Sequence, residues 1–238
     1  MTQDEIRTEG QAERVKLLSM VDILEPLAPE EIASLSQRIP ERSLKKGEMV
    51  YSARDASEVL YLLLKGRISL YDVVKGQELT FDVIGAGTIF GEASLARRTH
   101  PEYAQALESA LVLLLNLNTF WQLVRQKPEV NEKVVKLLVT RSGMNRSRMT
   151  DIAVKGIPAR LASLILDLLQ SDGVVTREGH YKIASHYTHD QLASMIGVTR
   201  ASVTRAFGTL QDSESVQLRR RKIYVTDLAT LSQLAVEG

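Results

Sequence analysis

Hydrophobic residues change their spacing three times along the chain. Between residues 15 and 39 they recur every three or four positions, which predicts helices because one helical turn takes 3.6 residues. Pro29, followed by two glutamates, marks the start of a second short helix within that stretch. The positions that carry the pattern are Leu17, Leu18, Val21, Leu24, Ile32 and Leu35.

Between residues 44 and 117 the apolar residues form short β-rich runs separated by glycines. Lys65-Gly66-Arg67 and Lys75-Gly76-Gln77 have the composition of tight turns between such runs. Many short strands with regular glycine punctuation are typical of an antiparallel barrel or jelly roll. The predicted strands cover residues 49–51, 59–64, 68–74, 79–84 and 111–115.

A helical pattern returns after Asn118, and residues 119–153 are predicted to form one long helix with a partial apolar seam. A helix longer than a small domain needs usually buries its seam against a partner chain. We therefore expect a dimerisation helix, with packing across its own barrel as the alternative. Gly156 and Pro158 indicate a hinge and the start of another helix, over residues 159–171.

These changes predict an α+β protein in three parts. Residues 1–118 would form N-terminal helices and an antiparallel β jelly-roll domain of the cyclic-nucleotide-binding type. Residues 119–155 would form the dimerisation helix, and residues 156–238 a winged helix-turn-helix domain.

The helix-turn-helix prediction rests on residues 188–210. Thr188 followed three residues later by Gln191 fits a capping box, which opens a short amphipathic helix. Gly197 permits the positive φ of a tight turn, and Thr199 can cap a second helix. Two short amphipathic helices joined at a glycine turn are the helix-turn-helix pattern.

In the second of these helices, polar side chains lie on a different side from the apolar face. Arginine can donate two hydrogen bonds to guanine in the major groove, and serine and threonine can bond bases or phosphates. After this helix, two predicted strands flank four successive cations at residues 219–222, which suits contact with a DNA backbone. A solvated turn is the alternative for that run. The candidate DNA-contacting residues are Thr188, Thr199, Arg200, Ser202, Thr204, Arg205, Arg219, Arg220, Arg221 and Lys222.

Composition narrows the class of protein. The 238 residues are 44% hydrophobic and 25% charged, which is typical of a folded chain and not of a disordered one. The apolar run at residues 110–121 is too short to span a bilayer, and the N-terminus lacks a secretory pattern. There is no cysteine, which excludes disulfides and cysteine-held zinc or iron–sulfur clusters. We therefore expect a cytoplasmic protein without membrane contact.

The formal net charge of +1 conceals an asymmetry between the two halves. Residues 1–118 carry 13 basic and 18 acidic side chains, a net charge of −5, whereas residues 119–238 carry 17 and 11, a net charge of +6. A basic second half suits contact with phosphates at one end of the molecule. A solvated charged face is the alternative.

In the order of these features along the chain, the protein resembles the Crp/Fnr family of bacterial transcription regulators from about residue 17 to residue 238. The segments that carry the resemblance are residues 87–95 (GTIFGEASL), residues 157–161 (IPARL) and residues 188–210. The resemblance implies a sensor barrel, a helix that pairs two subunits, and a reading helix that enters the major groove. It also implies a homodimer that binds double-stranded DNA at a palindromic promoter site. Such a dimer would act as an activator and contact RNA polymerase.

The resemblance assigns a guanine contact in each half-site to Arg205. Cyclic-AMP-responsive members have Arg-Glu at the start of the reading helix, where this chain has Arg200-Ala201. The sequence from Thr199 to Arg205 is more similar to the nitrogen-control branch. We therefore expect a half-site that differs from the TGTGA type.

At the effector pocket, this chain departs further from the family's usual pattern. Gly91-Glu92 matches the cassette that holds a cyclic-nucleotide ribose, but His100-Pro101 stands where an Arg-Ser pair grips the phosphate. We therefore expect no cAMP binding, and the absence of cysteine predicts no iron–sulfur cluster. Another small anion, with 2-oxoglutarate as one candidate, could be the effector. The candidate pocket residues are Phe90, Gly91, Glu92, Ala93, Arg97, Arg98, His100, Arg141, Asn145 and Arg146.

Several alternatives stay open at this stage. One is a constitutive regulator of the same fold that needs no effector, and another is a sensor that has lost DNA binding. An enzyme is not expected, because the chain has no P-loop, HExxH motif or nucleophile elbow. His180, His186 and His189 could hold a metal only if they converge, and we expect no metal site.

Overall fold

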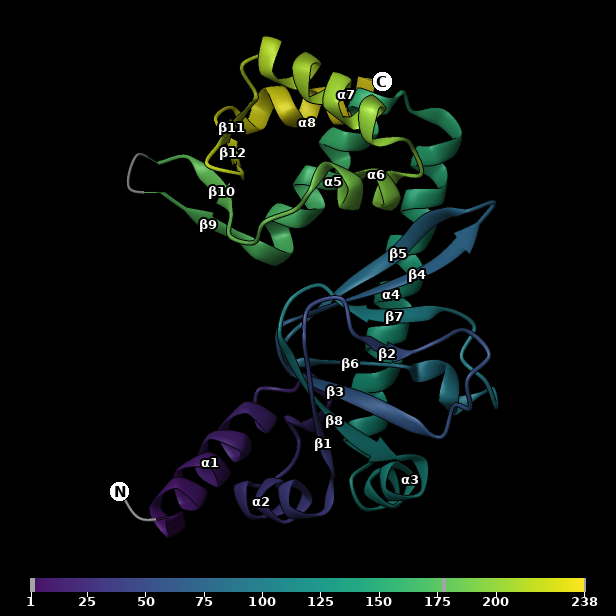
Figure 1. Cartoon of the computed structure of the whole chain (residues 1–238), viewed down its shortest axis with the longest axis vertical. Coiled ribbons are helices and arrows are strands. Elements are labelled where there is room, and N and C mark those ends of the chain that lie inside the picture. Colours follow the sequence, from purple (N-terminus) through teal and green to yellow (C-terminus); the bar gives the residue numbers. More distant parts are fainter. Residues whose placement is uncertain (1–2, 177–178, 238) are drawn as a thin grey trace. The chain divides into compact units, whose positions relative to one another are not determined.

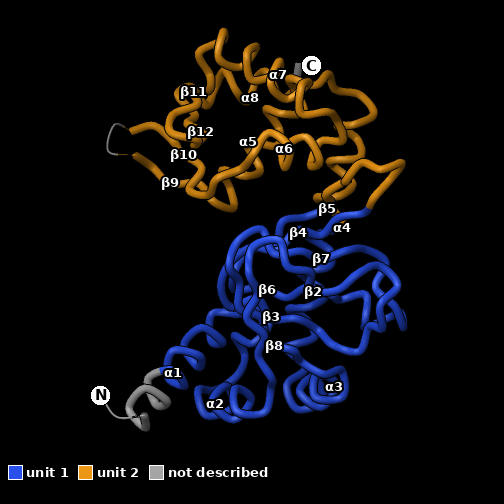
Figure 2. The backbone as a smooth tube through the Cα atoms, in the orientation of Figure 1, with its two compact units in different colours: residues 1–72, 81–141 blue, residues 73–80, 142–238 orange. Residues whose placement is uncertain are grey.

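The computed structural model describes residues 3–176 and 179–237. The chain divides into two compact units (Figure 2). The first unit comprises residues 1–72 and 81–141, and the second comprises residues 73–80 and 142–238. The division into three parts at residues 118 and 155 stays a prediction.

The first unit begins with helices that cover one side of a β structure. These are α1 (Gln3–Leu18), the short 3-10 helix η1 (Asp22–Leu24) and α2 (Pro29–Arg38). Pro29 occupies the first turn of α2, where its missing N–H has no partner to lose, as the sequence predicted. Most of the predicted apolar stripe is buried, with Leu18, Leu24 and Leu35 at most 2% exposed, whereas Leu17 is half-buried.

The β structure consists of two antiparallel four-stranded sheets, in the jelly-roll-like arrangement that the sequence predicted (Figure 1). One has the order β1 (Glu41–Leu44), β8 (Ala110–Asn116), β3 (Val59–Lys65), β6 (Thr88–Phe90). The other has the order β2 (Met49–Tyr51), β7 (Tyr103–Ala106), β4 (Arg67–Val74), β5 (Gln77–Gly85). A short 3-10 helix, η2 (Glu92–Leu95), follows β6.

Strand β3 is buried on both of its faces. Leu60, Leu62 and Leu64 pack among the surrounding helices, whereas Tyr61 and Leu63 pack inside the barrel. Successive side chains of a strand point to opposite faces, so this one strand contributes to both cores. A strand can be buried on both faces only if its sequence is nearly all apolar, as the sequence of β3 is.

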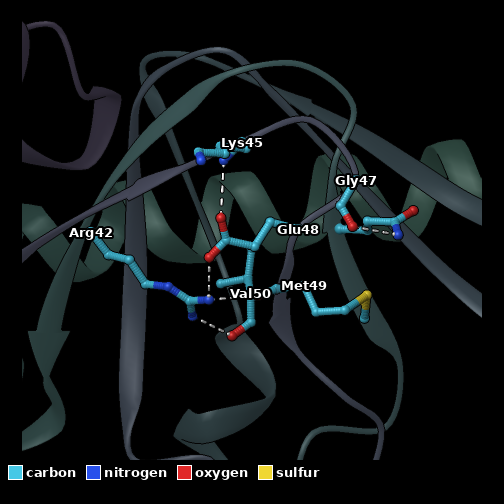
Figure 3. Close-up of polar contacts among 7 residues, drawn as sticks. Arg42, Lys45, Gly47, Glu48, Met49 and Val50 are labelled. Atoms are coloured by element: carbon cyan, nitrogen blue, oxygen red, sulfur yellow. Dashed lines mark hydrogen bonds and ion pairs between the residues drawn. The ribbon is translucent and has the colours of Figure 1, made fainter.

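Arg42 of β1 holds the corner where the chain turns into β2 (Figure 3). Its guanidinium donates to the carbonyl oxygens of Val50 at 2.9 Å and Met49 at 2.7 Å, and to Glu48 Oε1 at 3.1 Å. The other oxygen of that carboxylate accepts from the backbone N–H of Lys45 at 3.1 Å. This network fixes β2, and therefore the place of Tyr51 in the barrel interior.

The long helix predicted over residues 119–153 is two helices, so that prediction is wrong in this respect. α3 (Leu117–Gln126) ends before Lys127, and α4 (Pro128–Val154) begins after it. Lys127 has φ −134° and ψ 84°, outside the helical region. A proline disfavours helical geometry in the residue before it, so Pro128 stops one helix and starts the next.

The second unit contains α5 (Ile157–Asp172), α6 (His189–Ile196), α7 (Arg200–Asp212) and α8 (Leu228–Glu237). Its antiparallel sheet has the order β11 (Val216–Arg219), β12 (Lys222–Val225), β10 (Tyr181–Ile183), β9 (Gly173–Val175). α5 packs against α6, α7 and α8. The helix-turn-helix followed by a hairpin is confirmed.

The strands that sequence patterns missed are short or carry polar residues. They are β1, β6, β7, β9 and β10, which have three or four residues each. Runs of that length do not establish a period-two pattern, and pairing with a neighbouring strand decides their conformation.

Candidate functional site

The first helix of the motif, α6, begins with the capping box that the sequence predicted. The Thr188 Oγ1 accepts from the backbone N–H of Gln191 at 3.1 Å, and Gln191 Oε1 accepts from the backbone N–H of Thr188 at 2.8 Å. The helix ends at Gly197, which has φ +67° and ψ +41°. This left-handed conformation favours glycine, and it ends α6 so that Thr199 can cap α7.

The second helix, α7, separates a buried face from an exposed one. Val203, Phe207 and Leu210 are at most 1% exposed and join the core of the second unit. The residues predicted to read DNA lie elsewhere on the helix: Arg200, Thr204 and Arg205 are exposed and Ser202 is half-buried. Burial of the apolar face therefore determines which side chains remain accessible.

Hydrogen bonds orient several of these exposed side chains. Arg205 Nη2 donates to Ser202 Oγ at 3.2 Å, and the Thr204 hydroxyl donates to the Arg200 carbonyl oxygen at 3.1 Å. Ser202 also contacts the capping Thr199, with 3.0 Å between their hydroxyl oxygens. Arg200 Nε lies 3.8 Å from Asp190 Oδ2 with both side chains 70% exposed, a pair that adds little stability.

The hairpin of β11 and β12 carries the predicted run of cations at its turn. Arg219 pairs with Lys222, so Arg220 and Arg221 alone form the turn, with φ of +49° and +62°. Positive φ at both central residues is the hallmark of a type I′ turn, which favours Asn-Gly. Arginine at these positions costs conformational energy that the flanking hairpin overcomes.

The four cations do not occupy equivalent positions. Lys222 Nζ donates to the Ala184 carbonyl oxygen, and the Arg219 guanidinium lies 5.8 Å from the Tyr224 ring centroid. Arg220 and Arg221 are exposed. A groove of about 380 Å³ brings Arg221 together with Thr188 and Arg200, from three separate elements. The structure thus assembles a polar, cationic surface on α6, α7 and the hairpin turn.

The interior of the barrel in the first unit is filled by aromatic side chains. Phe90 is fully buried, and its ring centroid lies 5.0 Å from that of Tyr61. Gly91 has φ +75°, and a Cβ at that position would come within 2.8 Å of the Tyr61 ring. The glycine therefore lets the chain pass close to the aromatic cluster before Glu92.

His100 belongs to this aromatic cluster. Its ring is 1% exposed and stacks on Tyr51 with 3.6 Å between the centroids. Nδ1 lies 3.4 Å from Ser57 Oγ, and among the described residues Nε2 has no hydrogen-bond partner. Burial lowers the pKa of His100, against the opposing effect of Asp55. Burial therefore disfavours the charged form of the imidazole inside the barrel.

Tyr51 and Glu102 are polar members of the cluster that sequence patterns did not single out. The Tyr51 hydroxyl donates to Glu102 Oε1 at 3.0 Å. Burial raises the pKa of Glu102 most, the Tyr51 hydrogen bond lowers it, and the neighbouring Glu92 raises it. A strand residue and a loop residue 51 positions apart give no local signal of this contact.

Arg141 of α4 connects this helix to the barrel within the first unit through several polar contacts. Nη1 donates to Glu92 Oε1 at 2.7 Å, and Nη2 donates to the Ile89 carbonyl oxygen at 2.7 Å. Nε lies 3.7 Å from Asp82 Oδ2. The predicted pocket residues Glu92 and Arg141 are thus brought together and bind each other.

The other predicted pocket residues are placed differently. Ala93 is half-buried next to Glu92, whereas Arg97 and Arg98 are exposed on the loop before His100. Asn145 and Arg146 lie on the part of α4 that belongs to the second unit and are exposed. Their assignment to an effector pocket stays a prediction.

Comparison with known proteins identifies both units. A family model described as the cyclic nucleotide-binding domain matches residues 41–127, and one described as the Crp-like helix-turn-helix domain matches residues 159–234. The chain belongs to the Crp/Fnr family. The resemblance that the sequence suggested is confirmed, and the chain is a DNA-binding transcription regulator of this family.

Three Crp/Fnr proteins show how far the similarity reaches. The cyclic AMP receptor protein of Thermus thermophilus is 27% identical over 211 residues, which cover 88% of this chain and 94% of the relative. The global nitrogen regulator of a Nostoc species is 26% identical over 195 residues, covering 80% and 87%. The structure of a CooA mutant from Carboxydothermus hydrogenoformans has 20% identity and a TM-score of 0.78, covering 91% and 95%.

Two features are absent from residues 3–176 and 179–237. Within them, no three histidine, cysteine, aspartate or glutamate side chains form a group that could hold a metal ion. The Nδ1 of His189 instead contacts Thr204. None of the helices described is both long and apolar enough to cross a membrane.

The strained hairpin turn generates a prediction about stability and DNA affinity. Replacing Arg220 and Arg221 by Asn and Gly should raise the free energy of unfolding by about 1 kcal/mol, because these residues tolerate positive φ. The same variant should bind all duplex sequences more weakly, with a salt-dependence slope shallower by about 2, because two cations leave the phosphates.

Urea unfolding and binding titrations at several salt concentrations measure these two effects. Arg220→Lys with Arg221→Lys is the matched control, since it keeps both charges and the backbone strain. A shallower slope in this control, or an unchanged slope in the Asn-Gly variant, would contradict a phosphate contact at the turn.

The barrel interior generates a prediction about pH. The folded state lowers the pKa of His100, so the unfolded chain takes up that proton first, and stability is lost as the pH falls below about 6.5. The folded state raises the pKa of Glu102, so its contribution has the opposite sign: stability is lost as the pH rises above about 4.5. The two residues therefore oppose each other between about pH 6.5 and about pH 4.5.

Urea unfolding of three proteins at pH 7.5, 6 and 5 separates the two contributions. His100→Phe keeps a ring against Tyr51 and should lose less stability on acidification than the wild type. Glu102→Gln removes the compensating group and should lose more. Parallel pH curves for all three proteins would show that neither side chain is coupled to folding in this way.

Proposed function

We propose that this Crp/Fnr protein is a homodimeric activator that recognises a palindromic promoter site. The observation that carries the proposal is the exposed face of α7, where Arg200, Thr204 and Arg205 remain accessible while the opposite face is buried. Arginine and threonine at these positions are able to contact base edges in the major groove. The retained base-reading residues disfavour a sensor that has lost DNA binding.

The homodimer part of the proposal rests on α4. Large apolar side chains of this helix are exposed to solvent, among them Val135 at 50%, Val139 at 66% and Met149 at 72%. Apolar residues at this spacing favour burial against a second α4. Pairing two subunits would place two reading helices about 34 Å apart, the length of one DNA turn, which requires a palindromic site.

The remaining parts of the proposal follow from what such a regulator does. An activator works by contacting RNA polymerase at the promoter, so we expect this partner and a cytoplasmic location beside the chromosome. We propose no enzymatic activity, which agrees with the names of the relatives as transcription regulators.

We further propose that cAMP is not the effector. The buried His100 ring stacks on Tyr51, and a neutral imidazole offers one N–H donor where an arginine would offer a charged fork. Glu92, the candidate ribose ligand, already accepts from Arg141 at 2.7 Å. These contacts favour a constitutive regulator as the second candidate, with a different small anion at Arg141 as the remaining possibility.

Calorimetric titration tests the effector proposal. The purified protein should show no saturable heat with cAMP and no rise in melting temperature, because Arg141 already occupies Glu92 and His100 stands where an arginine would bind the phosphate. Titration with 2-oxoglutarate tests the anionic alternative by the same measurements. Saturable binding of cAMP with a higher melting temperature would contradict the proposal.

Selection from randomised duplex DNA by the full-length protein tests the DNA-reading proposal. The wild type should enrich a palindrome with a guanine in each half-site. Arg205→Ala should weaken binding by about 1–3 kcal/mol and lose the preference at one base pair of each half-site. The loss is local because one guanidinium reads one guanine.

Arg205→Lys is the matched control for charge. Lysine keeps the attraction to phosphates but lacks the planar fork, so this variant should keep its non-specific affinity and lose discrimination at the same base pair. Unchanged discrimination in Arg205→Ala would overturn the role of Arg205. Failure of a folded, dimeric wild type to enrich any sequence would overturn the constitutive candidate.

A further inference from the structure

The Thr204 hydroxyl group has two partners within the protein. It lies 3.1 Å from the Arg200 carbonyl oxygen, one turn earlier on α7. It also lies 2.8 Å from Nδ1 of His189, at the start of α6. Thr204 is nevertheless exposed, so the same side chain faces both the protein and the surface that would meet DNA.

The number of hydrogens limits what this hydroxyl can offer to DNA. A threonine hydroxyl has one hydrogen and two lone pairs. The carbonyl oxygen of Arg200 can only accept, so a hydrogen bond to it uses the hydroxyl hydrogen, and His189 then donates from Nδ1. In the other tautomer of His189, the hydroxyl would donate to Nδ1 instead. In both arrangements no hydrogen remains for a base.

His189 is itself held in place by the core of the second unit. Its ring stacks on Phe207, with 5.1 Å between the centroids and an angle of 20° between the planes. Phe207 is 1% exposed. The backbone of His189 lies in the first turn of α6, directly after the capping Thr188. The Nδ1 atom therefore approaches Thr204 from a fixed support.

Threonine in a helix divides between two χ1 rotamers, one of which bonds a carbonyl oxygen in the preceding turn. A second partner for the hydroxyl, provided by His189, favours that rotamer over the other. His189 thus determines both the orientation of the Thr204 side chain and the hydrogen-bonding capacity that remains.

We propose that His189 is a positioning residue that sets the base preference of Thr204. With its hydrogen committed, Thr204 can accept from adenine N6 or cytosine N4, or place its methyl group against the methyl group of thymine. It cannot donate to guanine O6 or to thymine O4. This inference rests on the proposed DNA-reading function of α7.

A double-mutant cycle on the full-length protein tests the inference by selection and titration. Thr204→Val removes the hydroxyl and keeps the shape, and the base pair whose preference it changes defines the Thr204 position. His189→Phe keeps the stack on Phe207 and removes Nδ1, so it should reduce the preference at that base pair about three- to tenfold, the value of one neutral hydrogen bond. In the Thr204→Val background, the same change should have less than a twofold effect.

His189→Asn is the matched variant for the hydrogen bond. It removes most of the ring stack and keeps a polar group near the position of Nδ1, so it should restore the preference that His189→Phe loses. A role of His189 in packing alone predicts the reverse order of the two variants. That reverse order, or additive effects in the cycle, would overturn the inference while leaving the proposed function intact.

A measurement without DNA addresses the same geometry. Three-bond couplings from the methyl group of isotope-labelled Thr204 report its χ1 rotamer. The wild type and His189→Asn should show a single rotamer, and His189→Phe should show averaging between two. Averaging already in the wild type would overturn the inference whatever the DNA result. A folded, dimeric wild type with one rotamer that selects no DNA sequence would overturn the constitutive candidate and, with it, the base-reading role of Thr204 in the protein without an effector.

Discussion

Burial of one face of α7 is the constraint on which the proposed DNA-reading surface depends. Val203, Phe207 and Leu210 are in the core of the second unit, so the helix cannot rotate about its axis without exposing them. Because the orientation of the helix about its axis is fixed in this way, Arg200, Thr204 and Arg205 are held in exposed positions. The turn at Gly197 supports the same arrangement, because its left-handed backbone ends α6 where Thr199 can begin α7. The polar residues proposed to contact DNA are thus oriented by apolar residues in the core.

Parts of this surface carry a conformational cost. Arg220 and Arg221 adopt positive φ in a turn where Asn-Gly would be relaxed. Their guanidinium groups are exposed at the end of the hairpin, away from the core that stabilises it. Residues held in unfavourable backbone regions persist where the surrounding structure determines them, and they concentrate at functional sites. Here the pairing of β11 with β12, which has four residue pairs in register, holds the turn in this conformation.

The interior of the barrel uses its polar groups in the opposite way. The Tyr51 hydroxyl donates to Glu102, Arg141 donates to Glu92, and the buried His100 ring stacks on Tyr51. A ligand that entered this site would have to displace bonds of 2.7 Å to Glu92 and to the Ile89 carbonyl oxygen, and repay their loss. The Arg141 guanidinium already holds the Glu92 carboxylate, which supports the proposal of either no effector or an anion that replaces Glu92 on Arg141.

The sequence was sufficient for the features that depend on local pattern. Helical spacing, glycine turns, the capping box at Thr188 and the cationic hairpin all follow from residues a few positions apart. Lys127 shows where even local patterns need backbone detail, since the effect of Pro128 on the residue before it divides a helix that periodicity alone would continue. The contacts between Glu92 and Arg141, and between Tyr51 and Glu102, join residues about fifty positions apart. They depend on strand register and helix packing, which hydrophobic periodicity does not specify. The pairing of His189 with Thr204 spans only fifteen positions, yet it depends on the angle between two helices. A motif therefore identifies which residues lie on the reading face, whereas the hydrogen-bonding capacity of each one is a property of the tertiary structure.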